Sequence, residues 1–184
     1  MALGALEDIE GKFLDVGCGE GLLLEDVLEQ NSDLKIFGID MDTEQIKRCR
    51  SKIGVPADEV NLLTGDAGEL PFKDNFFDLV TAINIFYNLS EDKMTNIIKE
   101  INRVLKPGGI LVADFRNKNN FFLRLRYLLA PVYDKSFRKQ GKLLKAYSKK
   151  EMESIVKKTG FRLRDIYKTG RIITSARVTV LVKK

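Results

Sequence analysis

The 184-residue sequence contains no histidine and no tryptophan, and it has only two cysteines and four prolines. Without histidine the chain lacks the commonest general base, the usual partner of nucleophilic serine or cysteine, and the commonest transition-metal ligand. Cys18 and Cys49 lie in different kinds of segment, and their spacing indicates neither a disulfide framework nor a metal site. We therefore expect no bound metal and a chemistry that needs no imidazole.

Long apolar runs are also missing. No stretch approaches the ~18 apolar residues that span a bilayer, and the first residues lack the basic and then apolar order of a secretory signal. We expect a cytoplasmic protein without a transmembrane segment. The length and the apolar share of 44% predict one self-sufficient domain over residues 1–184.

Charge is divided unevenly along the chain. Residues 1–115 hold 11 Lys and Arg against 22 Asp and Glu, whereas residues 116–184 hold 20 against 4. The basic second part favours an anionic partner, such as a phosphate, a nucleic acid or a lipid surface. Basic residues that only decorate solvated helix faces are an equally good interpretation.

Short β-rich apolar runs alternate with helix-period stretches through the first part of the chain. This alternation predicts parallel strands joined by crossover helices, in a sheet covered on both faces. The expected strands are residues 12–16, 35–40, 60–64, 77–84 and 110–115. Two further strands, residues 161–167 and 177–182, have a link too short for a crossover helix and should pair antiparallel. The fold class is α/β, a doubly wound Rossmann-like sheet of seven strands.

Two helices carry clear start and stop signals. One begins at Ser90 and ends before Lys106-Pro107-Gly108-Gly109, which should turn the chain into the strand that starts at Ile110. The other begins with Ser148-Lys149-Lys150-Glu151, the Ser-x-x-Glu form of a capping box, and closes at Gly160. We expect each helix to pack an apolar stripe against the sheet.

A glycine-rich turn follows the first expected strand, in Phe13-Leu14-Asp15-Val16-Gly17-Cys18-Gly19-Glu20-Gly21. Glycines at such a turn let a ligand approach the backbone closely. A dinucleotide fingerprint, G-x-G-x-x-G, would need a glycine where Leu22 stands. Asp15 and Glu20 beside the turn favour a ligand with an amino group over a pyrophosphate, which requires bare amides at a helix N-terminus. The turn therefore predicts a cationic nucleoside.

Acidic residues stand at the ends of the second and third expected strands. The Asp40 carboxylate can accept hydrogen bonds from both hydroxyls of a ribose, whereas Asp42 suits a helix N-cap. Asp66 can accept from an exocyclic amine such as adenine N6, although Gly65-Asp66 taken alone is simply a turn. Their succession at one sheet edge favours a nucleoside ligand.

Together these stretches resemble the class I S-adenosylmethionine-dependent methyltransferases, close in style to the ubiquinone and menaquinone biosynthesis type. The matching stretches, in family order, are FLDVGCGEG, IFGIDMD, GDAGELPF, FDLV with its strand, and VLKPGGILVADF. The resemblance implies the strand order 3-2-1-4-5-7-6, mostly parallel, with S-adenosylmethionine as cofactor and S-adenosylhomocysteine as product. Methyl transfer from an activated donor needs little acid or base help, so the missing histidine is no obstacle.

The resemblance also implies which residues hold the methionine part of the cofactor. Gly17 and Gly19 would form its floor, and Asp15 would help to hold its ammonium. Asn84 would lie beside its carboxylate and amine. Cys18 is part of this loop, and we interpret it as a small space filler rather than a nucleophile.

For the nucleoside part, the resemblance implies four residues. Asp40 would bind the ribose, and Met41 would pack on the adenine. Asp66 and Ala67 would meet the adenine edge. Metal ligands are not expected.

The acceptor site is defined less closely. If the acceptor must lose a proton, Asp114 and Tyr87 are the candidates. Residues 116–146 form a long insert, rich in basic and aromatic residues, that we interpret as a substrate lid. Candidate acceptor contacts are Tyr87, Arg116, Tyr127 and Tyr133. The mixture favours a small-molecule or lipid-like acceptor with an apolar body and an anionic group.

Other functions stay open. The basic second half supports an RNA acceptor, although the Asn-Pro-Pro-Tyr type motif is replaced by Asn84-Ile85-Phe86-Tyr87. A protein acceptor and a non-catalytic nucleoside-binding regulatory domain are further alternatives. A nicotinamide-dependent oxidoreductase is disfavoured by Leu22. Nothing in the sequence fixes the oligomeric state.

Overall fold

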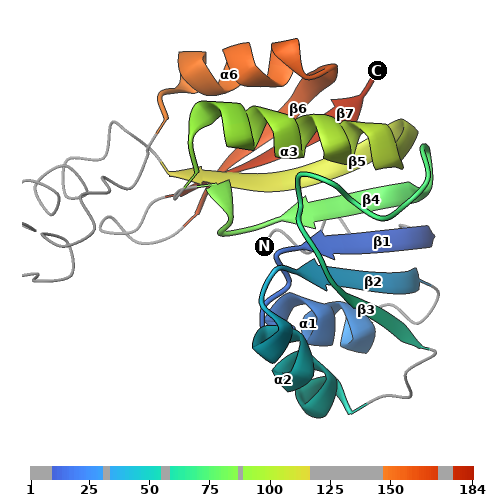
Figure 1. Cartoon of the computed structure of the whole chain (residues 1–184). Coiled ribbons are helices and arrows are strands. Elements are labelled where there is room, and N and C mark those ends of the chain that lie inside the picture. The colour runs from blue at the N-terminus through green and yellow to red at the C-terminus, as the bar shows by residue number, and fades with distance from the viewer. Residues whose placement is uncertain (1–9, 31–33, 55–58, 87–88, 117–146, 170–175) are drawn as a thin grey trace, which may run out of the picture.

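A seven-stranded sheet forms the middle layer of the computed structural model, which describes residues 10–30, 34–54, 59–86, 89–116, 147–169 and 176–184 (Figure 1). The strands are β1 (Gly11–Val16), β2 (Leu34–Asp40), β3 (Val60–Thr64), β4 (Phe77–Ala82), β5 (Leu105–Arg116), β6 (Phe161–Thr169) and β7 (Ala176–Lys183). Their order is β3-β2-β1-β4-β5-β7-β6. The predicted fold class and strand order are confirmed.

Strands β1 to β5 run parallel, and β7 pairs antiparallel with both β5 and β6. Strand β1 lies in the middle of the parallel part, with β2 on one side and β4 on the other. The order of the strands reverses at this point, and in open α/β sheets ligands bind beyond the carboxyl ends of the strands where that happens. The fold therefore places its ligand crevice next to the loop that follows Val16.

Helices cover both faces of the sheet. They are α1 (Leu22–Gln30), α2 (Thr43–Ile53), α3 (Glu91–Val104) and α6 (Lys149–Lys158). Residues alternate between the faces: Leu14 packs with α3 and α6, whereas Phe13 packs with α1 and α2. None of the helices that the structure describes is long and apolar enough to cross a membrane.

The expected helix caps are present. Ser90 Oγ accepts a hydrogen bond from the backbone N of Lys93 at the start of α3. Ser148 and Glu151 form the predicted capping box at the start of α6. Asp42 caps α2, as its sequence position indicated. These caps hold each helix start at the edge of the sheet where the strands end.

The expected strand boundaries near Gly108 were wrong. Strand β5 begins at Leu105, which pairs with Phe77, and the register then jumps so that Ile110 pairs with Leu79. Residues 106–109 therefore stand opposite the single residue Asp78 and form a bulge. Lys106 Nζ lies 2.7 and 2.9 Å from the two carboxylate oxygens of Asp78. Glycine and proline there produce a bulge inside a strand rather than a turn before it.

Two more boundaries differ from expectation. Strand β4 ends at Ala82 rather than at Asn84, because Asn84 has a φ of 62°, outside the range of a strand. Arg116, which we expected to open the insert, is the last residue of β5 and pairs with Ala176.

The connection from β3 to β4, residues 65–76, contains no helix and is described throughout. Its Leu70 side chain is buried, and Phe72 makes edge-to-face contacts with Phe37 and Phe77. Apolar packing thus holds this loop against the sheet where a crossover helix would otherwise lie.

Candidate functional site

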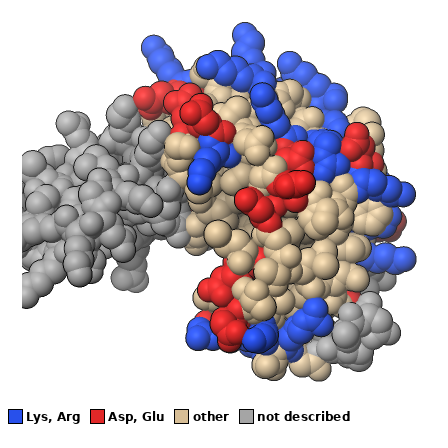
Figure 2. All heavy atoms as spheres, in the orientation of Figure 1, with Lys and Arg blue, Asp and Glu red and all other residues tan. Residues whose placement is uncertain are grey.

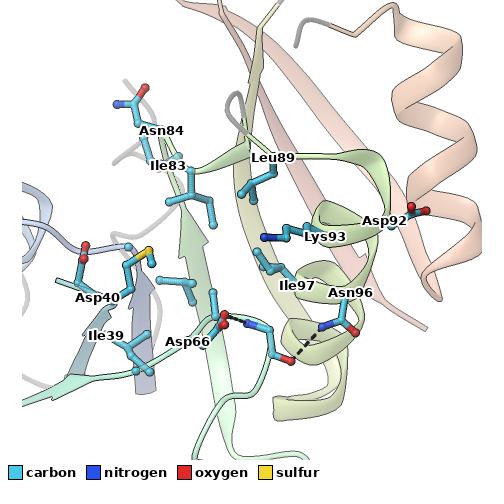
Figure 3. Close-up of a pocket in the computed structure, with 17 residues that line it drawn as sticks. Ile39, Asp40, Asp66, Ile83, Asn84, Leu89, Asp92, Lys93, Asn96 and Ile97 are labelled. Carbon is cyan, nitrogen blue, oxygen red and sulfur yellow. Dashed lines mark hydrogen bonds between the residues drawn. The ribbon is translucent and has the colours of Figure 1, made fainter. Parts of the chain in front are cut away.

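A cavity of about 750 Å³ opens at the carboxyl ends of β1 to β4 (Figure 3). It has three walls: the start of the glycine loop, the residues that end β2, β3 and β4, and the first half of α3. The lining residues are Val16, Gly17, Ile39, Asp40, Met41, Gly65, Asp66, Ala67, Gly68, Ile83, Asn84, Ile85, Leu89, Asp92, Lys93, Asn96 and Ile97. The cavity lies where the strand order predicted a ligand crevice.

The backbone amides of the glycine loop are already occupied within the protein. The amides of Gly17 and Cys18 donate to the carbonyl oxygen of Ile39, at 2.7 and 3.1 Å. The amide of Gly19 donates to Asp40 Oδ2 at 2.9 Å. A pyrophosphate needs free amides at a helix N-terminus. This loop therefore offers few amide donors to an anion.

Asp40 connects the glycine loop to the second strand. Its Oδ2 accepts from Gly19, and its Oδ1 accepts from the amide of Asp42 at 2.9 Å. A carboxylate has about four acceptor positions, so each oxygen keeps a second one. The two backbone hydrogen bonds fix the carboxylate at the cavity wall, where it can accept from a diol.

Asp66 is held in the same way at the end of β3. Its Oδ1 accepts from the amide of Gly68 at 2.7 Å, and the carbonyl of Gly68 accepts from Asn96 Nδ2 at 3.1 Å (Figure 3). A turn and a ligand contact were the alternatives that the sequence left open for Asp66. The structure contains the turn, and Asp66 also lines the cavity.

Asp15 lies outside the cavity lining. It is buried, and Thr81 Oγ1 donates to its Oδ1 at 2.6 Å. Burial raises the pKa of this carboxyl from 3.8 to about 7, with a smaller increase from the neighbouring Asp40, while the hydrogen bond from Thr81 lowers it. Near neutral pH, a cationic group close to Asp15 would favour its ionised form. Its role at a ligand ammonium stays a prediction.

Cys18 and Gly19 also lie outside the cavity lining. Cys18 is buried in the core beside α1 and α2, and its thiol is free, as is that of Cys49. A hydrogen bond with Cys49, together with burial, raises the pKa of Cys18, so its thiol stays protonated. A protonated buried thiol is a poor nucleophile, which supports the interpretation of Cys18 as a space filler.

Asn84 is held in a strained turn at the mouth of the cavity. Its φ is 62°, and its amide donates to Asp114 Oδ1 at 2.7 Å. Asp114 is 8% exposed. The acid that the sequence offered as a base thus supports the turn that carries Asn84, and its role in proton removal stays a prediction.

More than half of the chain matches a known protein family. A sequence profile described as a methyltransferase domain matches residues 14–113. The chain belongs to this methyltransferase family. The matched segment contains the glycine loop, both acidic strand ends and the α3 wall of the cavity.

Two relatives of the family show how far the similarity extends. A demethylmenaquinone methyltransferase of Bacillus cereus is 34% identical over 145 residues, which cover 71% of this chain and 58% of the relative. One from Staphylococcus aureus is 38% identical over 104 residues, covering 55% and 41%. The chain spans less than two thirds of the length of these curated relatives.

Solved methyltransferase structures share the fold. A SAM-dependent methyltransferase from Methanosarcina mazei superposes with a TM-score of 0.78 at 22% identity, covering 100% of this chain and 97% of that one. The magnesium protoporphyrin IX methyltransferase from Synechocystis, solved with bound SAH, has a TM-score of 0.80 at 16% identity, covering 100% and 79%.

The α3 wall of this cavity was not predicted from the sequence. Lys93, Asn96 and Ile97 lie on one face of α3 and line the cavity, and Figure 3 shows Lys93 reaching inward while Asp92 turns away. Their spacing of three and four residues was visible in the sequence. That periodicity predicts the apolar stripe that faces the sheet, but it does not indicate what the neighbouring polar positions contact.

Several expected acceptor residues lie outside the described residues. They are Tyr87, Tyr127 and Tyr133, with the rest of the 116–146 insert; of Arg116 only the backbone is described. Within the described ranges, no group of three acidic or cysteine side chains is arranged to hold a metal ion.

Part of the basic charge covers a solvated helix face. In the view of Figure 2, Lys and Arg side chains gather at the top of the molecule, where α6 lies. Lys149, Lys150, Lys157 and Lys158 of α6 are exposed, opposite its buried apolar residues. For α6, the interpretation that basic residues decorate a solvated helix face is sufficient.

Proposed function

We propose that this chain is an S-adenosylmethionine-dependent methyltransferase that holds its cofactor in the described cavity and methylates an apolar small-molecule or lipid-like acceptor. The occupied amides of the glycine loop carry the proposal. Because Gly17, Cys18 and Gly19 donate their amides within the protein, the loop suits a nucleoside without phosphate groups.

The charge of the cavity supports the same ligand. Asp40 and Asp66 lie in its wall, Asp15 lies close behind it, and Lys93 is the one basic residue among the described residues of the lining. A predominantly acidic site favours a ligand that carries a sulfonium and an ammonium. In the proposal, Asp40 accepts from the ribose hydroxyls and Asp66 accepts from the adenine amine.

When bound, S-adenosylmethionine would supply a methyl group on a positively charged sulfur. The acceptor's electron pair would form the new bond to the methyl carbon while the carbon–sulfur bond breaks, and the sulfur would leave as the neutral thioether of S-adenosylhomocysteine. The protein's task is to hold the acceptor in line and to exclude water. Asn84 and the apolar Ile83, Ile85 and Leu89 line the cavity beyond β4. They form the side toward which the acceptor would approach.

An apolar acceptor agrees with the names of the relatives and with the apolar residues that line the cavity beyond β4. The relatives from Bacillus cereus and Staphylococcus aureus are named for demethylmenaquinone, a quinone. We extend to this chain a flat apolar ring as the acceptor, with the basic 116–146 insert as its proposed lid. An RNA acceptor is the second candidate, because residues 116–184 are strongly basic.

The cofactor is tested by thermal unfolding with excess S-adenosylhomocysteine or NAD. A ligand at 100 times its Kd adds ~2.7 kcal/mol of stability. We expect the homocysteine nucleoside alone to stabilise the protein, and Asp40→Asn to lose that gain. Asp42→Asn is the matched control, since it alters the neighbouring helix cap outside the cavity lining. Stabilisation by NAD alone would refute the proposal.

The acceptor is tested by transfer of a labelled methyl group. The substrates are a demethylated naphthoquinone with a short prenyl tail and the same ring without the tail, both kept in the reduced hydroquinone form by added dithionite, and a mixed RNA pool. The hydroquinone ring is used because it supplies the electron pair that a quinone lacks. We expect label in the hydroquinones and none in RNA. Label in RNA alone would replace the small-molecule proposal with its alternative.

A further inference from the structure

The loop between β3 and β4 depends on α3 for its hydrogen bonds. A loop without a helix or strand ladder must find other partners for its buried backbone groups. Arg103 Nη2 donates to the carbonyl of Leu70 at 2.9 Å, and Nη1 donates to the carbonyl of Phe72 at 2.7 Å. Glu100 Oε2 accepts from the amide of Leu70 at 3.1 Å. One end of α3 therefore anchors the middle of this loop.

The other half of α3 reaches the part of the loop that lines the cavity. Asn96 Nδ2 donates to the carbonyl of Gly68, and the amide of Gly68 donates to Asp66 Oδ1 (Figure 3). A methyl group at position 68 would lie 2.9 Å from Asn96 Nδ2 and 3.3 Å from Asp66 Oδ1. An alanine at this position would require the ends of both side chains to move, whereas glycine leaves room for them. A free glycine backbone has many conformations unless it is held.

We propose that Asn96 is a positioning residue for recognition of the nucleobase. By holding Gly68, it fixes the Asp66 carboxylate, so that the second oxygen of Asp66 accepts from the exocyclic amine of adenine. This inference rests on the proposed cofactor. The inference makes α3 a determinant of base specificity, although this helix belongs to neither the glycine loop nor the strand ends that line the cavity.

The test compares two ligands that differ at the base. S-Adenosylhomocysteine carries the amine, whereas S-inosylhomocysteine carries an oxygen in its place. Loss of a hydrogen bond to a charged acceptor changes affinity by about 10- to 100-fold. Calorimetric Kd values for both ligands give a preference ratio for each protein. The variants are Asn96→Ala and, as a matched control on the same helix, Lys99→Ala, an exposed residue without a contact to the loop among those described.

We expect the wild-type protein and Lys99→Ala to share one preference ratio, and Asn96→Ala to reduce it by about fivefold or more with an unchanged Tm. An Asn96→Ala variant that weakens both ligands equally would overturn the inference, because a merely structural role moves both affinities together. Gly68→Ala is a second test, since it should lower the same preference ratio by disturbing the contact of Gly68 with Asn96 and Asp66.

The two proposals fail differently. If the wild-type protein binds neither ligand, the proposed function fails, and this inference fails with it. If it binds S-adenosylhomocysteine but does not prefer it over the inosyl analogue, the cofactor stands and only the role of Asn96 and Asp66 in base recognition is overturned.

Discussion

Two loops bound the cavity, and they are held in opposite ways. The glycine loop, residues 17–21, is fixed by its own backbone, which donates to the end of the adjacent strand β2. The loop of residues 65–76 is fixed by side chains of α3, far along the chain. The first loop is therefore sensitive to a Cβ added at Gly17, whereas the second is sensitive to the loss of a remote polar side chain.

The largest expected effect concerns Asp15, at the base of the glycine loop. Its pKa is raised from 3.8 to about 7 in the folded protein, so the fold favours its protonated form. The stability that protonated Asp15 contributes is fully present below about pH 3.8 and is lost as the pH rises through 7. The free energy of unfolding falls by about 4 kcal/mol at most over that range. Asp15→Asn should escape this loss while keeping an acceptor for Thr81.

The measurement is urea unfolding of the ligand-free protein and of Asp15→Asn at intervals from pH 4 to pH 8. The difference between the two free energies of unfolding isolates Asp15 from other carboxyls, and it should grow with pH in favour of the variant. A constant difference over that range would contradict the prediction.

The next effect breaks the glycine loop itself. At Gly17 an added Cβ would overlap Ile85 Cγ2, and the φ of 74° is unfavourable for any other residue. We expect Gly17→Ala to destabilise the protein by about 3 kcal/mol. Gly19→Ala is the matched control, because its φ of 53° is also positive but nothing lies within 4 Å of the new Cβ. It should cost about 1 kcal/mol in the same urea titration.

The corresponding test of the other loop is Arg103→Ala. The change removes the donors to the carbonyls of Leu70 and Phe72 and unpairs Glu100 from its guanidinium. We expect a loss of about 2–3 kcal/mol in the free energy of unfolding. Arg103→Lys should recover part of it, since an ammonium keeps the charge but not the planar fork. Equal free energies of unfolding for Arg103→Ala and Lys99→Ala would show that Arg103 does not anchor the loop of residues 65–76.

The smallest effect separates helix capping from ligand contact. Asp42 Oδ1 accepts from the amide of Glu44 at the start of α2, and Asp42 lies outside the cavity lining. Asp42→Ala should cost about 1 kcal/mol, and Asp42→Ser should restore most of it. Neither change should alter the Kd for S-adenosylhomocysteine, measured by calorimetry. A weakened Kd would show that the cap and the ligand site are coupled.

These contrasts also explain what the sequence could predict. The glycine loop, Asp40 and the strand order follow local rules, because glycine spacing and buried runs act over a few residues. Asn96 and Arg103 act on a loop about 30 positions away in the chain. Helical spacing places Asn96 on one face of α3 with Lys93, but it does not indicate what that face contacts. A contact set by the tertiary fold leaves no local pattern.

The failures at strand ends have the same physical origin. Lys106-Pro107-Gly108-Gly109 has the composition of a turn, but the ion pair of Lys106 with Asp78 keeps the segment on β4 as a bulge. Asn84 was expected in a strand because its neighbours are apolar. Its hydrogen bond to Asp114 instead stabilises a left-handed turn.

The position of β7 has a consequence for the way the chain folds. This strand follows β6 in sequence, yet it lies between β5 and β6 and pairs with both. Strand β6 therefore joins the sheet only through β7, and the two strands must dock on β5 as a pair. The pairing of β7 with β5 joins distant parts of the chain, and such contacts form more slowly than the hairpin of β6 and β7 itself.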